Sequence, residues 1–396
     1  MANEMLKQIE AFVGVHLLGN EAQFDSPTET PLPVYGRFRE TGLSNWWLPK
    51  SLGGRGINLE QSVDIVSELA YGDAGVAFTL FISIIGTSIV QLYGSDELKQ
   101  RYLGGLATKG GFCALLGSER EAGSELIRMR TNATKRSNDY VVSGRKYFST
   151  NAASADFFVC IAAVPDDPSG YAALIIPRDT PGVKIEKRWN LVGVRAAMTY
   201  QVTLQECRIP SVNLIKGNGL RLLEIGLNAS RILMAATAVG ISRRMRDLCL
   251  DYARTKSLKN STLLVNPVFA AKLGQMEMQI EAMLTQCRAA ARDWDGFLSK
   301  PNAPEELLQR GTLKSALVSK ILCGQLGWQI ASMGSEMFGG IGYTDDSLAA
   351  KLLRDVRYVS IVEGGDDVLR DLIFSRYVVP NATRPTTPPA PPAART

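Results

Sequence analysis

The spacing of apolar residues divides the chain into two helical parts with a strand-forming part between them. Before about residue 110, apolar side chains recur at helical spacing, as in Gln61–Gly72. Helical spacing returns from about residue 220, and it predicts long amphipathic helices at Leu222–Ala253, Val268–Phe297 and Glu305–Met333. Shorter helices are expected at Leu348–Val356 and Asp366–Tyr377.

The middle third has short apolar runs separated by turn residues, a pattern typical of antiparallel strands. Ser143-Gly144 is predicted to be a hairpin turn between Tyr140–Val142 and Arg145–Ser149. The segment PDDPSG separates two further strands, Phe157–Val164 and Tyr171–Ile176. Tyr200–Leu204 forms another strand, which is expected to end before Arg208-Ile209-Pro210. The pattern indicates an antiparallel barrel or sandwich.

Together these patterns predict an α+β fold of three domains. The expected boundaries are an N-terminal helical domain at 1–112, a β-domain at 113–219 and a C-terminal helical bundle at 220–379. The remaining residues, 380–396, are rich in Pro, Ala and Thr, a composition that cannot pack a core. This tail is predicted to be disordered.

One uncharged stretch, Ala74–Ser95, is long enough to span a membrane. Polar residues such as Thr79, Ser83 and Gln91 interrupt it, and its flanks are acidic rather than aromatic and basic. A buried helix inside a helical domain is therefore expected, and no membrane association is predicted.

Composition excludes several classes of function. The 396 residues carry 44 basic and 39 acidic side chains, a net charge of +5. That balance is unlike a nucleic-acid-binding protein, although it suits an acidic substrate or partner. A single histidine, His16, argues against a Ser-His-Asp triad and a His-rich metal site, so no metal is predicted. The six cysteines contain no CxxC pair, and the polar N-terminus resembles no signal peptide, so a reducing cytoplasm is expected.

Candidate chemistry first appears at Ser118–Glu125 (SEREAGSE), which follows the apolar strand Phe112–Leu116. A turn of small residues allows backbone N–H groups to approach an anion or the edge of a flat ring. An ordinary surface turn explains the same residues, so this segment alone does not decide the function.

Three segments in order give a clear resemblance to a known family. Ser118–Glu125 resembles the T-E-P-x-A-G-S-D turn of the acyl-CoA dehydrogenases, and Lys146–Asn151 (KYFSTN) resembles their K-x-W-I-T-N strand. Gly339–Tyr343, Arg354-Asp355 and Ile361–Gly364 resemble their G-G-x-G-[FY], R-D and I-Y-E-G motifs. The resemblance extends over about residues 35 to 378.

The resemblance implies a flavoprotein with a C-terminal four-helix bundle. FAD would lie between the β-domain and the C-terminal helices, and a neighbouring subunit would help to bind it in a homodimer or homotetramer. The implied reaction takes a proton from Cα of an acyl thioester and a hydride from Cβ to flavin N5. An electron-transfer flavoprotein is the expected kind of electron acceptor.

Glu363 matches the family's catalytic base. A carboxylate in a water-poor pocket has a raised pKa, which suits abstraction of a weakly acidic C–H proton. Some members place the base on the long helix instead, at the position matching Ser230, which is not acidic here. The Glu363 N–H is expected to bind the thioester carbonyl. Outside the motif, Glu363 would be interpreted as a surface residue beside Asp366 and Asp367.

The resemblance also assigns residues to the cofactor and the substrate. Ser118 and Thr150 match hydroxyl groups that hydrogen-bond the flavin ring, and Phe148 matches the aromatic residue against it, usually Trp. Arg231 matches an arginine near the base, although arginines on long helices are often simply solvated. The full cofactor set is Ser118, Gly123, Ser124, Phe148, Ser149, Thr150, Lys256, Gly339, Gly340 and Gly365. The substrate set is Ser124, Asn228, Arg231 and Gly364.

The chain departs from the family pattern at several positions. The R-x-x-F-G segment that reaches the partner's FAD is represented by Lys256–Asn260, which keeps only the charge of Lys256. Arg120, Glu336, Gly365 and Asn228 replace the usual Pro, Gln, Thr and Asp. These changes suggest altered FAD contacts and a biosynthetic enzyme, whose thioester carrier is CoA or a carrier protein. Arg243–Arg246 (RRMR) is a candidate docking surface for an acidic partner, or a solvated helix face.

Two other functions fit the same motifs. An oxygen-using flavin monooxygenase could share the fold, although that group generally lacks the base. A non-catalytic binding or assembly protein would account for the lost cofactor contacts. A thioester dehydrogenase is the favoured hypothesis, because it alone requires Glu363.

Overall fold

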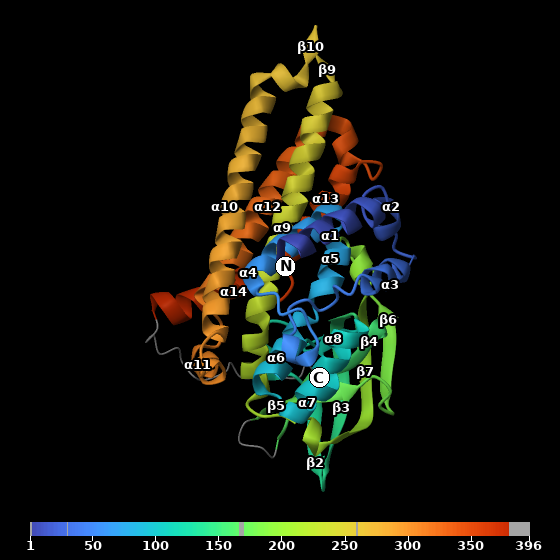
Figure 1. Ribbon diagram of the computed structural model, residues 1–396, viewed down its shortest axis with the longest axis vertical. Coiled ribbons are helices and arrows are strands. Elements are labelled where there is room, and N and C mark those ends of the chain that lie inside the picture. The colour runs from blue at the N-terminus through green and yellow to red at the C-terminus, as the bar shows by residue number, and fades with distance from the viewer. Residues whose placement is uncertain (1, 30, 166–169, 259, 380–396) are drawn as a thin grey trace, which may run out of the picture.

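The computed structural model describes residues 2–29, 31–165, 170–258 and 260–379. Long helices form one end of the molecule and a sheet forms the other (Figure 1). The helix α9 (Gly219–Thr255) runs from the sheet to the far tip of the helical end. The predicted tail, 380–396, lies outside the described residues.

The N-terminal part is helical, as predicted. Side chains cap its helices: Asn58 Oδ1 accepts the Gln61 N–H at 2.9 Å and Asp73 Oδ1 accepts the Val76 N–H at 2.8 Å. The helices are α1 (Ala2–His16), α2 (Glu21–Phe24), α3 (Leu32–Glu40), α4 (Leu59–Gly72), α5 (Ala74–Phe81), α6 (Ile84–Tyr93), α7 (Asp96–Leu98) and α8 (Gly104–Lys109).

The middle part is one mixed sheet, in the order β6-β7-β3-β2-β4-β5-β8. Its strands are β1 (Phe112–Leu116), β2 (Asn132–Arg136), β3 (Asp139–Thr150), β4 (Ala155–Ala163), β5 (Tyr171–Pro177), β6 (Val183–Arg188), β7 (Thr199–Pro210) and β8 (Leu214–Ile215). Most pairs are antiparallel, but β1 and β2 each pair with β4 in parallel. Among the described strands this path does not close into a barrel.

The C-terminal part is a bundle of long helices with short ones packed on it. Its elements are α9, the hairpin β9 (Ser257–Leu258) and β10 (Ser261–Thr262), α10 (Pro267–Leu298), α11 (Ala303–Arg310), α12 (Lys314–Phe338), η8 (Gly339–Tyr343), α13 (Leu348–Val356), η9 (Arg357–Ser360), α14 (Asp366–Ile373) and η10 (Phe374–Val378). The hairpin caps the far tip of the bundle (Figure 1).

The structure corrects three local predictions. Ser143-Gly144 is not a turn: β3 runs through it, and the register with β7 shifts between Val142 and Gly144, which is a β-bulge. The strand β7 does not end before Arg208 but continues to Pro210. The predicted helix Glu305–Met333 is two helices, α11 and α12, because Gly311 adopts a φ of +69° between them.

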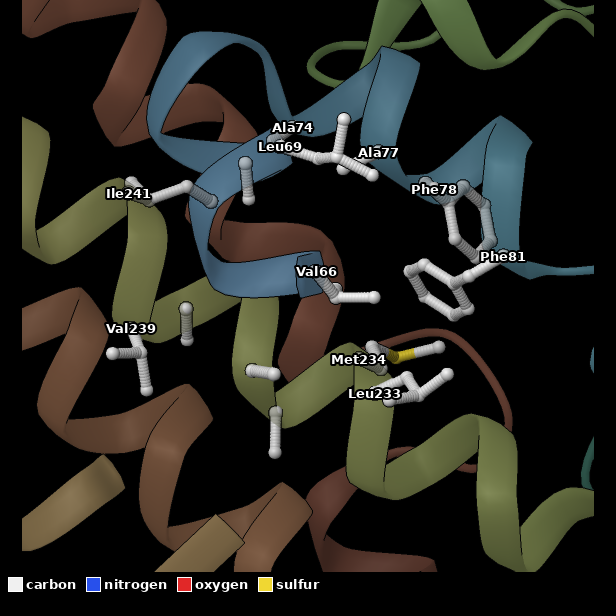
Figure 2. Packing of buried hydrophobic residues seen from close by; sticks show 14 of the residues in the cluster. Val66, Leu69, Ala74, Ala77, Phe78, Phe81, Leu233, Met234, Val239 and Ile241 are labelled. Atoms are coloured by element: carbon white, nitrogen blue, oxygen red, sulfur yellow. The ribbon is translucent and has the colours of Figure 1, made fainter. Parts of the chain in front are cut away.

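The uncharged stretch Ala74–Ser95 lies in the core, as predicted, but as two helices, α5 and α6. Figure 2 shows Phe78 and Phe81 of α5 beside Leu233 and Met234 of α9. Two helical segments, Ala74–Tyr93 and Gly219–Thr255, are long and apolar enough to cross a membrane, yet 89% of each apolar window is buried inside the protein. Both therefore serve as core helices here.

A buried ion cluster joins the three parts of the chain. Lys351 of α13 donates to Asp73, the cap of α5, at 2.7 Å and to Asp355 at 2.5 Å. Asp355 also accepts the Val194 N–H, from the loop before β7, at 2.6 Å. Asp355 of the Arg354-Asp355 motif thus links the loop before β7 to α13 and, through Lys351, to α5.

Candidate active site

Two buried cations hold the backbone turn that carries Glu363. Glu363 and Gly364 have φ values of +58° and +100°, a conformation that L-residues rarely adopt. Arg231 of α9 donates to the Glu363 carbonyl oxygen from Nε at 3.1 Å and from Nη2 at 2.8 Å. Lys320 of α12 donates to the next carbonyl oxygen, of Gly364, at 2.8 Å. The surrounding helices therefore stabilise an otherwise strained turn.

The two oxygens of the Glu363 carboxyl group have different environments. Oε1 accepts a hydrogen bond from the Ser230 hydroxyl at 2.5 Å. Oε2 is buried and, within the described residues, has no hydrogen-bond partner. One oxygen is thus held in place and the other is available to accept a proton.

Burial raises the pKa of Glu363 to about 7, against the opposing effects of the Ser230 hydrogen bond and the charges of Arg231 and Lys320. Burial also lowers the pKa of Lys320 to about 8, and the nearby charge of Arg231 acts in the same direction. A carboxyl group with a pKa near neutrality is suited to general-base chemistry.

A second buried ion pair supports the turn that begins at Ser118. Lys146 of β3 is fully buried and donates to Glu119 Oε1 at 3.0 Å, to the Gly117 carbonyl at 2.9 Å and to the Ile161 carbonyl at 2.7 Å. The Tyr147 N–H donates to the Ser118 carbonyl at 2.8 Å. The two predicted flavin segments, 118–125 and 146–151, are therefore adjacent.

Phe148 projects from a second bulge in the β3–β7 pairing, between Lys146 and Ser149. Its φ is +54° and its side chain is 58% exposed, which is unusual for a large aromatic residue on a strand. The Trp189 ring lies 5.0 Å from it, and the Trp189 Nε1 is buried without a partner in the described chain. An exposed aromatic face supported by a second ring suits contact with a flat cofactor.

The hydroxyl groups of Ser149 and Thr150, which follow Phe148, differ in whether a protein group already binds them. The Thr150 hydroxyl is hydrogen-bonded to that of Thr199 at 2.9 Å, whereas Ser149 Oγ is buried with no partner among the described residues. Gly123 and Ser124 are exposed in their turn, and Ser118 is half-buried.

Not all of the predicted cofactor residues are brought together within one chain. Lys256 lies just beyond the C-terminal end of α9, directly before the hairpin at the tip of the bundle (Figure 1). Gly339 and Gly340 follow α12, whose last residue, Phe338, packs on Tyr252 near the same end of α9 with ring centroids 4.8 Å apart. Arg231 and Lys256 are 25 positions apart, which corresponds to about 37 Å along a helix. These tip residues cannot act on a group bound beside Arg231 of the same chain.

Both hydrogen-bonding groups of the Asn228 side chain are occupied by the protein, and Gly365 lies beside the turn that carries Glu363. The Asn228 amide donates to the Gly311 carbonyl at 2.9 Å and to the Ile225 carbonyl at 3.1 Å, and its Oδ1 accepts the Leu313 N–H at 2.8 Å. This favours a role in fixing the α11–α12 connection. Gly365 is the N-cap of α14, directly after the base turn.

The structure removes the basis for a docking surface at Arg243–Arg246. Arg243 pairs with Glu68 of α4 at 3.0 Å and Arg244 with Glu21 of α2 at 3.0 Å. Arg246 pairs with Glu277 of α10 and with Asp247. These cations link α9 to other helices and are not a free basic surface.

Sequence reasoning missed two residues at the site. Lys320 is the one charge in the apolar run SALVSKILCG, and that isolation is a signal that it has a buried partner. Trp189 stands outside the family motifs, and no local pattern pointed to its contact with Phe148.

Comparisons with known proteins agree with this fold. The acyl-CoA dehydrogenase N-terminal, middle and C-terminal domain models match residues 2–110, 114–207 and 217–378. The probable acyl-CoA dehydrogenase fadE25 of Mycobacterium leprae is 27% identical over 382 residues, which cover 95% of each chain. Butyryl-CoA dehydrogenase from Megasphaera elsdenii has a TM-score of 0.85 at 24% identity, covering 95% of this chain and 98% of its own. The prolyl acyl carrier protein oxidase AnaB has a TM-score of 0.83 at 22% identity, covering 94% and 97%.

The fold and the matched domains define a flavin-dependent oxidoreductase that acts on an acyl thioester. The chain belongs to the acyl-CoA dehydrogenase family. The expectation of FAD as cofactor is confirmed at the level of the family. The residues present fit it: an exposed aromatic face at Phe148, a buried unpaired hydroxyl at Ser149 and the small-residue turn after Ser118.

Proposed function

We propose that this enzyme introduces an α,β double bond into an acyl thioester, with Glu363 as the base that removes the α-proton. The observation that carries the proposal is the state of its carboxyl group. Oε2 is buried and unpartnered in the described chain, and the pKa is raised by burial to about 7. A carboxylate with these properties can accept a weakly acidic proton near neutral pH.

The backbone at Glu363 supports the same reaction. Arg231 and Lys320 bind the carbonyl oxygens of the turn, while the Glu363 N–H has no acceptor within the described residues. We assign this N–H to the thioester carbonyl, where it would stabilise the negative charge that develops as the α-proton leaves. Bound FAD would accept the hydride from Cβ.

The proposal extends to the cofactor contacts. Ser118, Gly123, Ser124, Phe148, Ser149 and Thr150 of one chain would contact the flavin, and Lys256, Gly339 and Gly340 of a neighbouring chain would complete its site. The residues of the first group lie in and beside the sheet, whereas Lys256 lies at the opposite end of α9, and this separation supports the division (Figure 1). It requires at least a homodimer.

We propose that the acyl group is carried on CoA or on the phosphopantetheine arm of a carrier protein, and that an electron-transfer flavoprotein reoxidises the enzyme. The departures from the family motifs, such as Lys256–Asn260, favour a biosynthetic role. A cytoplasmic location fits the six cysteines, which are all buried free thiols.

The test is anaerobic bleaching of the bound flavin by a panel of acyl-CoA and acyl-carrier thioesters. We expect at least one thioester to bleach the wild-type enzyme, and Glu363→Gln to slow bleaching by about 10²–10⁴-fold while retaining the flavin. A folded, flavin-loaded Glu363→Gln enzyme that is bleached at the wild-type rate would exclude Glu363 as the base. No bleaching by any thioester, with a stable oxygen adduct of the reduced enzyme, would favour the monooxygenase alternative.

A further inference from the structure

Ser230 makes the sole direct hydrogen bond to the Glu363 carboxyl group within the described residues. Its hydroxyl lies 2.5 Å from Oε1, and the serine is fully buried on α9. The charged and titratable groups near the carboxyl come from three elements: Arg231 on α9, Lys320 on α12 and the neutral Tyr358 hydroxyl on η9. Asp366 on α14 acts on Lys320.

The two nearby cations do not contact the carboxyl oxygens. Both bound nitrogens of Arg231 donate to the Glu363 carbonyl, and Lys320 donates to the Gly364 carbonyl. The Tyr358 hydroxyl is paired with Thr237 at 2.6 Å. Orientation of the carboxyl group therefore depends on Ser230, while Arg231 and Lys320 fix the backbone from which it projects.

We propose that Ser230 is a positioning residue for the base: its hydroxyl holds Oε1, so that Oε2 receives the substrate proton. The inference rests on the proposed function of Glu363 and adds which oxygen reacts. In the step, the Cα–H bond breaks, its proton forms a bond to Oε2, and the electron pair remains on Cα. Ser230 keeps its own proton throughout and stabilises the ionised base before the transfer.

Two substitutions and a matched control separate this role from simple packing. Ser230→Ala removes the hydroxyl, and Ser230→Thr keeps it. Ser242→Ala is the control, because Ser242 is also buried on α9 but its hydroxyl has no partner in the described chain. Each variant is compared in the pH profile of flavin bleaching and in the pH profile of the melting temperature of the holoenzyme.

The expected shift of each pH profile has a defined direction. Removing a hydrogen bond to the ionised carboxylate raises its pKa, so the acidic limb of the bleaching profile of Ser230→Ala should move up by about one pH unit. The melting temperature of the wild type, taken relative to that of Glu363→Gln, should fall as the pH rises from about 4.5 to 7, because Glu363 binds more protons in the folded state there. In Ser230→Ala this fall should extend to higher pH, while Ser230→Thr and Ser242→Ala should resemble the wild type.

The outcomes distinguish the inference from the function on which it rests. Unshifted profiles in a folded Ser230→Ala enzyme would overturn the positioning role, even if Glu363 is the base. The melting profile needs no substrate, so it tests the contact even if no thioester bleaches the flavin. Loss of the melting step in Glu363→Gln identifies that step as the titration of Glu363. If Ser242→Ala shifted the profiles equally, the effect would be general packing and the inference would fail.

Discussion

The ammonium group of Lys146 lies 3.0 Å from the Glu119 carboxylate, and both side chains are buried behind the turn that begins at Ser118. Glu119 also accepts the backbone N–H groups of Arg130 and Thr131 at 2.6 and 3.0 Å. One ion pair therefore joins β1, β3 and the start of β2. Burial alone would raise the pKa of Glu119, but Lys146 and these donors hold it below its usual range.

Breaking this pair should be costly. Lys146→Met leaves Glu119 buried and uncompensated, so we expect the free energy of unfolding to fall by about 3–5 kcal/mol, measured by denaturant titration. Lys146→Met with Glu119→Gln should recover part of the loss, because no buried charge remains. Arg128→Met, which breaks the exposed pair with Glu125, is the control and should cost at most about 1 kcal/mol. Equal losses in the single and double variants would refute this explanation.

The turn that carries Glu363 should not tolerate a side chain at Gly364 but should tolerate one at Gly365. Gly364 has a φ of +100°, and an added Cβ would lie 2.8 Å from Leu369 Cδ2. Gly364→Ala should therefore cost about 1–3 kcal/mol and slow flavin bleaching, because the backbone of Glu363 must shift. Gly365 has a φ of −61°, and the nearest atom to an added Cβ is 4.0 Å away. Gly365→Ala should stay within about 0.5 kcal/mol of the wild type in the same unfolding titration, and an equal loss would contradict this account.

Titration of Lys320 should make the free energy of unfolding change with pH in the alkaline range. Its folded pKa of about 8 lies below its ordinary value of 10.5, so the unfolded state binds more protons between those values. Stability should therefore rise with pH across this window, by at most about 3 kcal/mol. The difference in melting temperature between the wild type and Lys320→Met, followed against pH, isolates this step. Lys314→Met, at an exposed site on the same helix, should leave the step in place. A flat difference curve for Lys320→Met would show that Lys320 does not titrate there.

Periodicity predicted the long helices well because each has one apolar face over many turns. The stretch Leu222–Ala253 corresponds to α9 at Gly219–Thr255. The same periodicity predicted α11 and α12 as one helix, because the apolar spacing continues across Gly311, where the two helices are separate. Ser143-Gly144 has turn residues, yet pairing with β7 on one side and β2 on the other keeps the strand continuous.

The sequence motif predicted Glu363 as the candidate base, but the surroundings of its carboxyl group could not be predicted from the sequence. Glu363, Ser230 and Lys320 are far apart in the sequence, and only tertiary packing of α9 and α12 brings them together. The same packing explains why Arg243–Arg246 is not a docking surface: its partners Glu21, Glu68 and Glu277 lie on three other helices. Local charge patterns carry no information about such partners.

The separation of Arg231 and Lys256 along α9 gives a test of the shared site. If the tip of one chain completes the flavin site of another, Lys256→Glu should weaken FAD retention, while Glu363→Gln should slow bleaching by about 10²–10⁴-fold without loss of flavin. Each variant alone would then be nearly inactive. In a mixed dimer, the Lys256→Glu chain supplies an intact Glu363 and the Glu363→Gln chain supplies an intact Lys256, so one of the two sites is complete.

Unfolding and refolding an equal mixture of these two variants with FAD should therefore restore activity. Half of the dimers would be mixed, and each would have one complete site of two, so the phase of bleaching at the wild-type rate should have about a quarter of the wild-type amplitude. Refolded single variants are the controls for recovery, and a mixture of Glu363→Gln with Ser230→Ala tests whether mixing itself alters the signal. A mixture of the two main variants no more active than the average of its parents would show that Lys256 serves its own chain or no flavin at all.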